Sequence, residues 1–326
     1  HGSGLAAAAG AGAVGGVVFL VAGLLVGALG RREWDVLRGA AARVPRRSGG
    51  AGLALTAVAV LAALYAPVTR DLAHVWLTVP YYSYGFLVPV FSAWLLWDAR
   101  AQLASPRPAW SPAALALLVG GLAMLAAGLV ADSLALRAVS LPAALGGAAW
   151  LTLGGERAAA VAFPLGFLVF MAPLPDAVVP AVSPGLQHLA AWFTAGVLTT
   201  AGIPTEREGL LVRIPGVILH ITEACNGVRF LLAMIVLGTA FAWTTQARLA
   251  RRATVLALAV VVALVANLVR VAGTGLLAHY WGPEAATGFA HVAYGKLVYF
   301  AMMIPFVAGV LVLRRAGRVP RVPDVA

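Results

Sequence analysis

Three residues of the chain have side-chain types that could together carry out an acyl-transfer reaction. They are the sole cysteine, Cys225, the arginine Arg270 within an apolar segment, and His291 at the start of another apolar segment. A cysteine thiolate is a nucleophile, an arginine can stabilise an oxyanion, and a histidine transfers protons near neutral pH. These three types form a sufficient acyl-transfer site if the fold brings them together.

Cys225 lies just before an apolar segment at residues 227–243. The free N–H groups and the dipole at a helix N-terminus favour a thiolate, and Arg229, four residues on, is expected to act from the same helix face. Glu223 and Asn226 flank the cysteine, and an asparagine can form local hydrogen bonds at a helix start. By position alone, a small buried hydrophobic residue is an equally good interpretation of this cysteine.

Arg270 lies within an otherwise apolar run at residues 260–271. An ionisable residue inside a membrane segment indicates function because it is costly there. Asn267, three residues earlier, shares the helix face and could orient the guanidinium. The alternative for Arg270 is a side chain that extends to the membrane interface. The alternative for His291 is an interfacial histidine without a catalytic role.

The elements that must position these residues are membrane helices. The 326-residue chain is 62% hydrophobic and 11% charged, with a mean hydropathy of +0.93. Soluble domains carry about 25% charged residues, and disordered chains are poor in apolar ones, so both classes are excluded. The composition predicts an all-α polytopic membrane protein, a bundle of about 8–10 transmembrane helices. Spans are expected at residues 11–30, 51–66, 84–97, 112–131, 134–153, 159–173, 227–243, 253–279 and 291–313.

The arginines predict which face is cytoplasmic. They gather at residues 31–49, 98–111, 244–252 and 314–321. Basic residues in short loops favour the cytoplasmic side, so we assign these four segments to it. Cys225, Arg270 and His291 then all fall at the opposite, outer face, although they were not used to assign the topology.

The same topology predicts a small structure on the outer face. The segment at 159–173 runs outward and the one at 227–243 runs inward, so the residues between them begin and end outside. The apolar stretch 182–202 is therefore expected to be an interfacial helix rather than a span. Residues 210–221 have the pattern of a short hairpin.

Charge and cysteine content limit the possible partners. The net charge of +11 comes from 22 arginines and one lysine against 12 acidic residues. Arginines in short loops set topology, so no nucleic-acid partner is expected. One cysteine excludes a cysteine-rich metal site, and no metal or cofactor is expected. We expect an extra N-terminal span with an arginine-rich loop at 1–50, a transmembrane catalytic domain at 51–313 and a basic cytoplasmic tail at 314–326.

Five stretches of the sequence occur in an order that identifies a family. They are Tyr-Gly-Phe-Leu at 84–87, Gly-Ile-Pro at 202–204, Glu-Ala-Cys-Asn-Gly-Val-Arg at 223–229, Asn-Leu-Val-Arg-Val at 267–271, and His291 followed by Gly295. This order resembles the exosortase/archaeosortase family of membrane cysteine transpeptidases. The resemblance implies that Cys225 is the nucleophile, Arg270 the essential arginine and His291 the third member. Asn226 stands where serine is commoner, which marks a subfamily.

The resemblance also implies a substrate and a location. Exosortases act on secreted proteins that end in a Pro-Glu-Pro-like motif, a transmembrane helix and a basic tail, and transfer them to a surface acceptor, here an unknown lipid or glycan. His291 points to the bacterial members, hence to the cytoplasmic (inner) membrane and its lipids, with the active site facing the periplasm or exterior. Arg229, Arg213 or both are expected to pair with the glutamate of the motif, because arginine suits carboxylate recognition.

Other classes of membrane protein remain as alternatives. A transporter would place ionisable residues near the bilayer midplane, whereas here they gather at one face. A glycan transferase usually needs carboxylates at its active face, and the outer acidic residues show no persuasive paired spacing. The alternative function is a non-catalytic transporter or scaffold subunit for exopolysaccharide or surface-protein export. Such a subunit would tolerate loss of the Cys225 thiol.

Glycines and aromatic residues receive structural interpretations. The pairs Gly120-Gly121 and Gly146-Gly147 are typical of helix-packing surfaces. Trp76, together with the tyrosines at 81, 82 and 84, is expected in an aromatic belt at the membrane interface.

Overall fold

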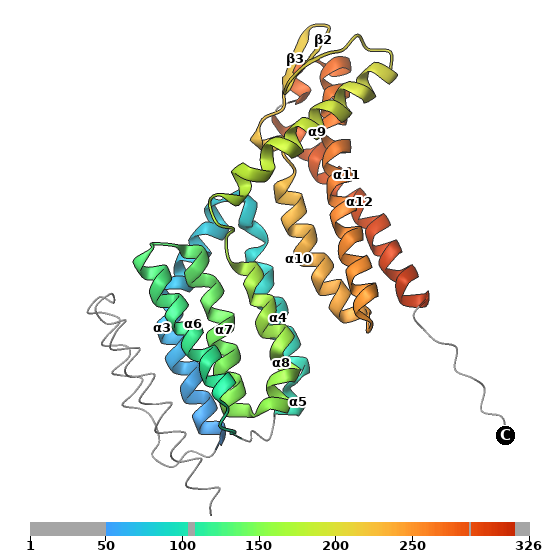
Figure 1. Cartoon of the computed structure of the whole chain (residues 1–326). Coiled ribbons are helices and arrows are strands. Elements are labelled where there is room, and N and C mark those ends of the chain that lie inside the picture. Colours follow the sequence, from blue (N-terminus) through green and yellow to red (C-terminus); the bar gives the residue numbers. More distant parts are fainter. Residues whose placement is uncertain (1–49, 104–107, 287, 317–326) are drawn as a thin grey trace, which may run out of the picture. The chain divides into compact units, whose positions relative to one another are not determined.

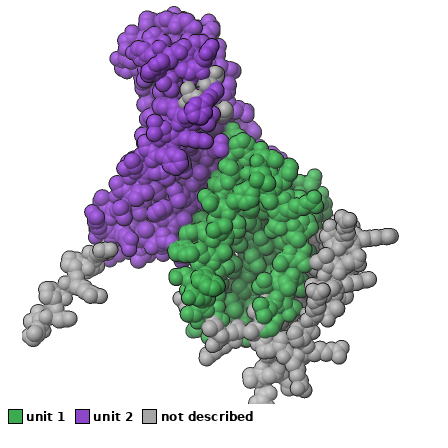
Figure 2. Space-filling view, turned by 180° about the vertical axis from the view of Figure 1, so that it is seen from behind, with its two compact units in different colours: residues 1–174 green, residues 175–326 purple. Residues whose placement is uncertain are grey.

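The computed structural model describes residues 50–103, 108–286 and 288–316. The predicted span at 11–30 and most of the predicted N-terminal region and tail lie outside these residues. The chain forms two compact units, residues 1–174 and 175–326, which Figure 2 shows in different colours. The described part is almost wholly helical, with one small sheet (Figure 1). An all-α polytopic membrane protein is therefore confirmed.

The described part of the first unit is made of helices. Two of them begin at a serine: the Ser111 hydroxyl accepts a hydrogen bond from the Ala114 N–H, and Ser133 accepts one from Leu136. Serine is favoured there because its oxygen satisfies an N–H group that the helix leaves free. The elements are α3 (Gly50–Thr78), η1 (Pro80–Phe86), α4 (Leu87–Asp98), α5 (Arg100–Leu103), α6 (Pro112–Val130), α7 (Leu134–Leu153), α8 (Gly155–Phe167) and η2 (Leu168–Met171).

Helices α6 and α7 pack closely because each has a glycine at the contact (Figure 1). A Cβ at Gly121 would lie 2.6 Å from the Ala144 nitrogen, and one at Gly147 would clash with the backbone of Leu118. Small residues let two membrane helices approach to this distance. The packing predicted for the two glycine pairs is confirmed for one glycine of each pair.

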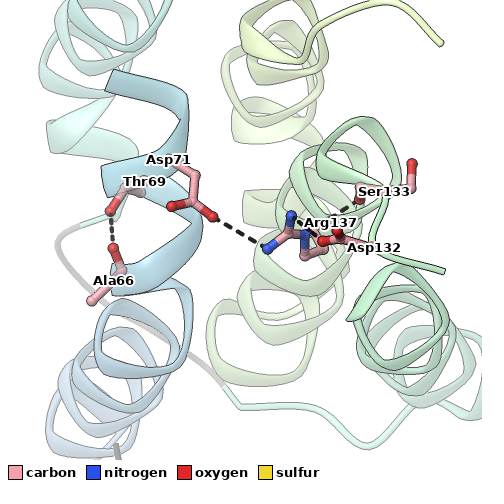
Figure 3. A network of polar contacts seen from close by, with 6 residues as sticks. All are labelled: Ala66, Thr69, Asp71, Asp132, Ser133 and Arg137. Carbon is pink, nitrogen blue, oxygen red and sulfur yellow. Dashed lines mark hydrogen bonds and ion pairs between the residues drawn. The ribbon is translucent and has the colours of Figure 1, made fainter. Parts of the chain in front are cut away.

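An ion-pair network joins α3 to the start of α7 (Figure 3). The Arg137 guanidinium donates to Asp71 on α3 over 3.2 Å and to Asp132, in the turn before α7, over 3.4 Å. Tyr65 and Ser140 make a second, buried hydrogen bond of 2.9 Å between the same two helices. The buried Tyr65–Ser140 bond pairs two polar groups in apolar parts of the two helices, where unpaired polar groups are costly, whereas the Arg137 network lies at the partly exposed start of α7.

Trp76 differs from the prediction of an interfacial belt. Its side chain is buried, and its indole N–H donates to the Met171 carbonyl over 3.0 Å. A Cβ at Gly85 would clash with the Trp76 ring, so the Tyr-Gly-Phe motif contributes to this packing. Bonding to Met171 satisfies the indole N–H away from water, which explains why Trp76 can be buried.

The second unit combines three long helices with a helix and a sheet at one end (Figure 1). The sheet is antiparallel in the order β1-β2-β3, and its last two strands turn through residues 215–216. Its elements are α9 (Val178–Thr200), β1 (Glu206–Glu208), β2 (Leu211–Ile214), β3 (Val217–His220), η3 (Glu223–Cys225), α10 (Val228–Thr245), α11 (Leu249–Trp281), η4 (Pro283–Ala286) and α12 (Gly288–Ala316).

The hairpin predicted at residues 210–221 is present as β2 and β3. The structure adds a strand to it, β1, in a charged segment that has the composition of a turn. Glu206 pairs with Arg213 in the sheet register, and the Arg213 guanidinium binds Glu208 over 3.1 Å. The charged residues of β1 are thus placed opposite or next to Arg213 of β2, and opposite charges across neighbouring strands stabilise a sheet.

Two apolar cores hold the second unit together. One lies between α9, the sheet and α11, where Leu198, Val212, Ile221 and Val271 are buried. The other lies between α10, α11 and α12 and includes Met234, Val255, Ala259, Phe306 and Val310. The residues that connect the sheet to α10, Cys225 among them, pack against the first core.

Six described helices are long and apolar enough to cross a membrane. The 23-residue helix α9 is not among them, and its interfacial location stays a prediction. The predicted spans at 84–97 and 159–173 correspond to α4 and α8, of only 12 and 13 residues, preceded by η1 and followed by η2 respectively, and neither helix is among the six. The six are Leu55–Thr78, Pro112–Val130, Leu134–Leu153, Val228–Thr245, Leu249–Trp281 and His291–Ala316.

Candidate active site

Cys225 ends the short helix η3, directly before α10. Its backbone N–H donates to Thr222 over 2.9 Å, and its side chain is half-buried. Gly227 separates the cysteine from the helix with a left-handed φ of 76°. A Cβ there would lie 2.6 Å from Cγ of Asn267. Glycine is thus required both by the backbone conformation and by the close approach of α11.

The break at Gly227 corrects the expectation for Arg229. Because α10 begins at Val228, Cys225 and Arg229 do not lie on one continuous helix, and the four-residue spacing does not place them on a common face. The Arg229 side chain is exposed. Its position at the start of α10 leaves it available to a molecule outside the helix bundle.

Side chains from α9 hold the segment that carries Cys225. The buried Asn226 amide donates to the Ser183 hydroxyl over 2.8 Å, and its oxygen accepts from the Val228 N–H over 3.0 Å. Gln187, one turn after Ser183, donates to the Ile221 carbonyl over 3.3 Å. Sequence reasoning missed the roles of Ser183 and Gln187; their signal was two polar residues four positions apart, on one face of the helix.

Asn267 connects Cys225 to Arg270. Its amide donates to the Cys225 carbonyl over 3.0 Å, and its oxygen accepts from Nη2 of Arg270 over 3.2 Å. Both side chains are buried, with exposed fractions of 4% and 8%. The expected orientation of the guanidinium by Asn267 is therefore present in the structure.

An aromatic ring of α10 and a glycine of α12 lie against the Arg270 side chain. The guanidinium carbon lies 5.5 Å from the centre of the Phe230 ring, which itself stacks on Tyr299. A Cβ at Gly295 would lie 3.4 Å from Cδ of Arg270, so α12 approaches the arginine closely at this glycine. The cation is thus held by a polar partner on its own helix and by the face of an aromatic ring on α10.

His291 lies at the start of α12, half-buried and close enough to Arg270 for an electrostatic interaction. Its Nδ1 atom lies 3.4 Å from the Thr274 hydroxyl oxygen, and that hydroxyl donates to the Arg270 carbonyl over 2.9 Å. Thr274 was not predicted, since a threonine in a membrane helix has no distinguishing sequence signal.

One chain of hydrogen bonds therefore runs through the three predicted catalytic residues. It passes from the Cys225 backbone carbonyl to the Asn267 amide and on to the Arg270 guanidinium. From the Arg270 backbone carbonyl it continues to the Thr274 hydroxyl and to Nδ1 of His291. The chain joins the residues just before α10, the second half of α11 and the start of α12, so residues distant in sequence meet at one place.

The remaining predicted residues lie around this chain. Glu223 begins η3 with an exposed side chain, and Asn226 is buried against α9. Arg213 is exposed on β2 and paired with Glu208. Among the described residues, no group of three or more histidine, cysteine or acidic side chains is placed to hold a metal ion.

The opposite end of the second unit is basic. Arg248 precedes α11, and the Arg251 guanidinium donates to the carbonyl of Ala316, at the end of α12, over 3.2 Å. Arg252 stacks on Trp243 near the end of α10. Because Cys225 precedes the start of α10, the hydrogen-bond chain and the arginines lie at opposite ends of these helices.

These features define a helical membrane protein with a cysteine, an arginine and a histidine connected at one end of its helices. Residues 76–313 match the family described as transmembrane exosortase, and the chain belongs to this family. No curated protein and no solved structure gives a significant match. Family membership supports a membrane transpeptidase-type role that processes secreted proteins.

Proposed function

We propose that this protein is a membrane-embedded cysteine transpeptidase. It cleaves a C-terminal sorting signal, consisting of a Pro-Glu-Pro-like motif, a transmembrane helix and a basic tail, from secreted proteins. It then transfers the protein to a lipid or glycan acceptor at the cell surface. The single observation that carries this proposal is the hydrogen-bond chain linking Cys225, Arg270 and His291 through Asn267 and Thr274.

The proposed reaction proceeds through a thioester. The Cys225 thiolate attacks the scissile carbonyl carbon and forms a C–S bond, while Arg270 stabilises the oxyanion. The C–N bond then breaks as His291 donates a proton to the leaving nitrogen, which departs with the C-terminal helix. A nucleophile of the acceptor then attacks the thioester carbon, its proton passes to the neutral His291, and the C–S bond breaks to release the Cys225 thiolate. Limited access of water at the membrane interface favours transfer over hydrolysis.

We place this reaction at the outer face of the bacterial cytoplasmic membrane. The arginines at the far end of α10–α12 support this orientation, because basic residues favour the cytoplasmic side. Arg270 lies about 32 Å along α11 from Leu249, counting 1.5 Å per residue. If α11 enters at the inner boundary, this distance puts the guanidinium at the outer edge of a hydrocarbon core of about 30 Å.

Co-expression with a secreted protein that carries such a signal tests the proposal. Wild-type enzyme is expected to remove the signal, and Cys225→Ala is expected to leave it intact because the nucleophile is gone. The measurement is the mass of the substrate recovered from the membrane fraction, with equal enzyme levels checked by immunoblot. Cleavage by Cys225→Ala would exclude the cysteine mechanism and favour the transporter or scaffold alternative.

A further inference from the structure

We infer that Thr274 is a positioning residue that fixes the proton of the neutral His291 ring on Nδ1. Nε2 is then the ring atom that transfers protons. This inference rests on the proposed function for its catalytic meaning, whereas the tautomer itself follows from the geometry of α11 and α12.

The assignment follows from the single hydrogen of a hydroxyl group. Thr274 Oγ1 lies 2.9 Å from the Arg270 carbonyl oxygen and 3.4 Å from Nδ1 of His291. A carbonyl oxygen can only accept, so the hydroxyl hydrogen is directed to it along the shorter contact. The hydroxyl oxygen can then only accept from the histidine. Nδ1 must therefore carry a hydrogen, and the neutral ring keeps its lone pair on Nε2.

The contact lies where the backbone is held from several sides. Thr274 follows Arg270 by one turn of α11, and the same Arg270 is bound to Asn267 one turn earlier. On α12, the Tyr294 hydroxyl donates to the Val269 carbonyl over 3.0 Å, which joins the two helices beside His291. Rigid elements of this kind hold a side chain in one orientation more precisely than a loop does.

The tautomer determines how protons move in the proposed reaction. Nε2 accepts the proton from the thiol as the S–H bond breaks, giving an imidazolium with Nδ1–H still directed to Thr274. The Nε2–H bond then breaks as that proton passes to the leaving nitrogen. In Thr274→Val the acceptor for Nδ1–H is absent, so the ring can take the Nε2–H tautomer, which has no lone pair at the atom that must accept the proton.

The tautomer can be measured directly by ¹⁵N NMR of histidine-labelled protein in lipid nanodiscs, under alkaline conditions that keep the ring neutral. The His291 signals are identified by their loss in His291→Gln. We expect protonated Nδ1 in wild type and in Thr274→Ser, and a mixture or protonated Nε2 in Thr274→Val. The matched control is Thr254→Val, which removes the same helical hydroxyl bond, to Ala250, about 30 Å along α11 from Thr274.

Substrate processing gives the second readout. Thr274→Val should slow processing by on the order of tenfold, the scale of one hydrogen bond to a charged group, while Thr274→Ser and Thr254→Val stay within about twofold of wild type. Protonated Nε2 in wild type, or an unchanged tautomer or processing rate in Thr274→Val, would overturn the inference. If wild type shows protonated Nδ1 but processes no substrate, the tautomer assignment stands and the proposed function fails.

Discussion

Asn267 is the side chain on which the arrangement of the candidate site depends most. One end of its amide donates to the Cys225 carbonyl, and the other end accepts from Arg270. An aspartate could accept from the arginine but could not donate to the carbonyl, so the asparagine type is required by both contacts. This dual role explains why an asparagine stands three residues before the arginine in a segment that is otherwise apolar.

Arg229 and Arg213 are the predicted contacts for the glutamate of the substrate. Both side chains are exposed, although Arg213 is already paired with Glu208. Reversing both charges, Arg213→Glu with Arg229→Glu, should slow processing of an unaltered substrate by about tenfold or more, because a charge-assisted pair becomes a repulsion. The measurement is the processing rate in co-expressing cells.

A third exposed arginine of the same surface region provides the control. Arg207 lies on β1, and Arg207→Glu should leave the rate unchanged. A substrate whose motif glutamate is changed to lysine should regain part of the rate with the doubly reversed enzyme. Unchanged processing by that enzyme would remove both arginines from substrate recognition.

Residue types predicted part of this site and packing determined the rest. Cys225, Arg270, Asn267 and His291 were predictable because a thiol, a charge, an amide or an imidazole is conspicuous beside or within an apolar segment. The role of Thr274 was not predictable, since a threonine in a membrane helix has no distinguishing signal. The four-residue spacing of Ser183 and Gln187 places them on one helix face but does not say which segment they bind. Their roles depend on which helix packs against them, and the sequence does not specify that.

The turn between β3 and α10 is the element that sets the position of the nucleophile. Ala at Gly227 would need a left-handed φ of 76° and would place a Cβ 2.6 Å from Asn267. Gly227→Ala should therefore displace Asn267 from the Cys225 carbonyl and slow processing by more than about tenfold, as loss of a buried hydrogen-bonded contact does. Alkylation of the sole cysteine, measured by mass, should change in rate at the same time.

Gly202→Ala separates the two effects of this substitution. Gly202 has a similar φ of 79° but no atom within 4 Å of an added Cβ. The Gly202→Ala variant should lose only about 1–2 kcal/mol of unfolding free energy, the cost of a left-handed φ for alanine. Its unfolding temperature should therefore be lower, while processing continues. Equal losses of processing in the two variants would assign the effect to backbone strain rather than to Asn267.

The elements themselves were predicted unevenly. Hydropathy located the long helices, and the turn at residues 215–216 indicated the hairpin. The strand β1 was missed because Glu206 and Glu208 have the composition of a turn, and their pairing with β2 is visible only in the folded sheet. Trp76 was predicted at the interface, whereas it is buried. Its burial depends on a hydrogen bond to Met171, 95 positions away, and the sequence does not reveal a contact over that separation.

At the scale of the whole molecule, the chain divides after residue 174 into two units, and helices of each unit are joined by a network of polar contacts. Hydropathy does not mark this boundary, since each unit contains three of the six candidate membrane helices among the described residues. In the first unit this is the network of ion pairs around Arg137 (Figure 3). In the second it is the hydrogen-bond chain of the candidate site.

The two aspartates of the Arg137 network should contribute unequally to stability. The Asp71 side chain is 46% exposed, whereas that of Asp132 is 97% exposed. Asp71→Asn is expected to reduce stability by about 0.5–1 kcal/mol after solvent screening, a shift of a few degrees in unfolding temperature. Asp132→Asn, measured by thermal unfolding in the same detergent, should show no shift. A larger loss for Asp132→Asn would contradict this ranking.

The thioester on Cys225 is the central claim, and trapping it is the most direct measurement. In membranes that contain enzyme and substrate, added hydroxylamine attacks a thioester and leaves a hydroxamate at the new C-terminus of the substrate. The account predicts that mass spectrometry finds this hydroxamate with wild-type enzyme and not with Cys225→Ala. A cleaved substrate that ends only in a carboxylate despite hydroxylamine, or a hydroxamate formed by Cys225→Ala, would contradict it.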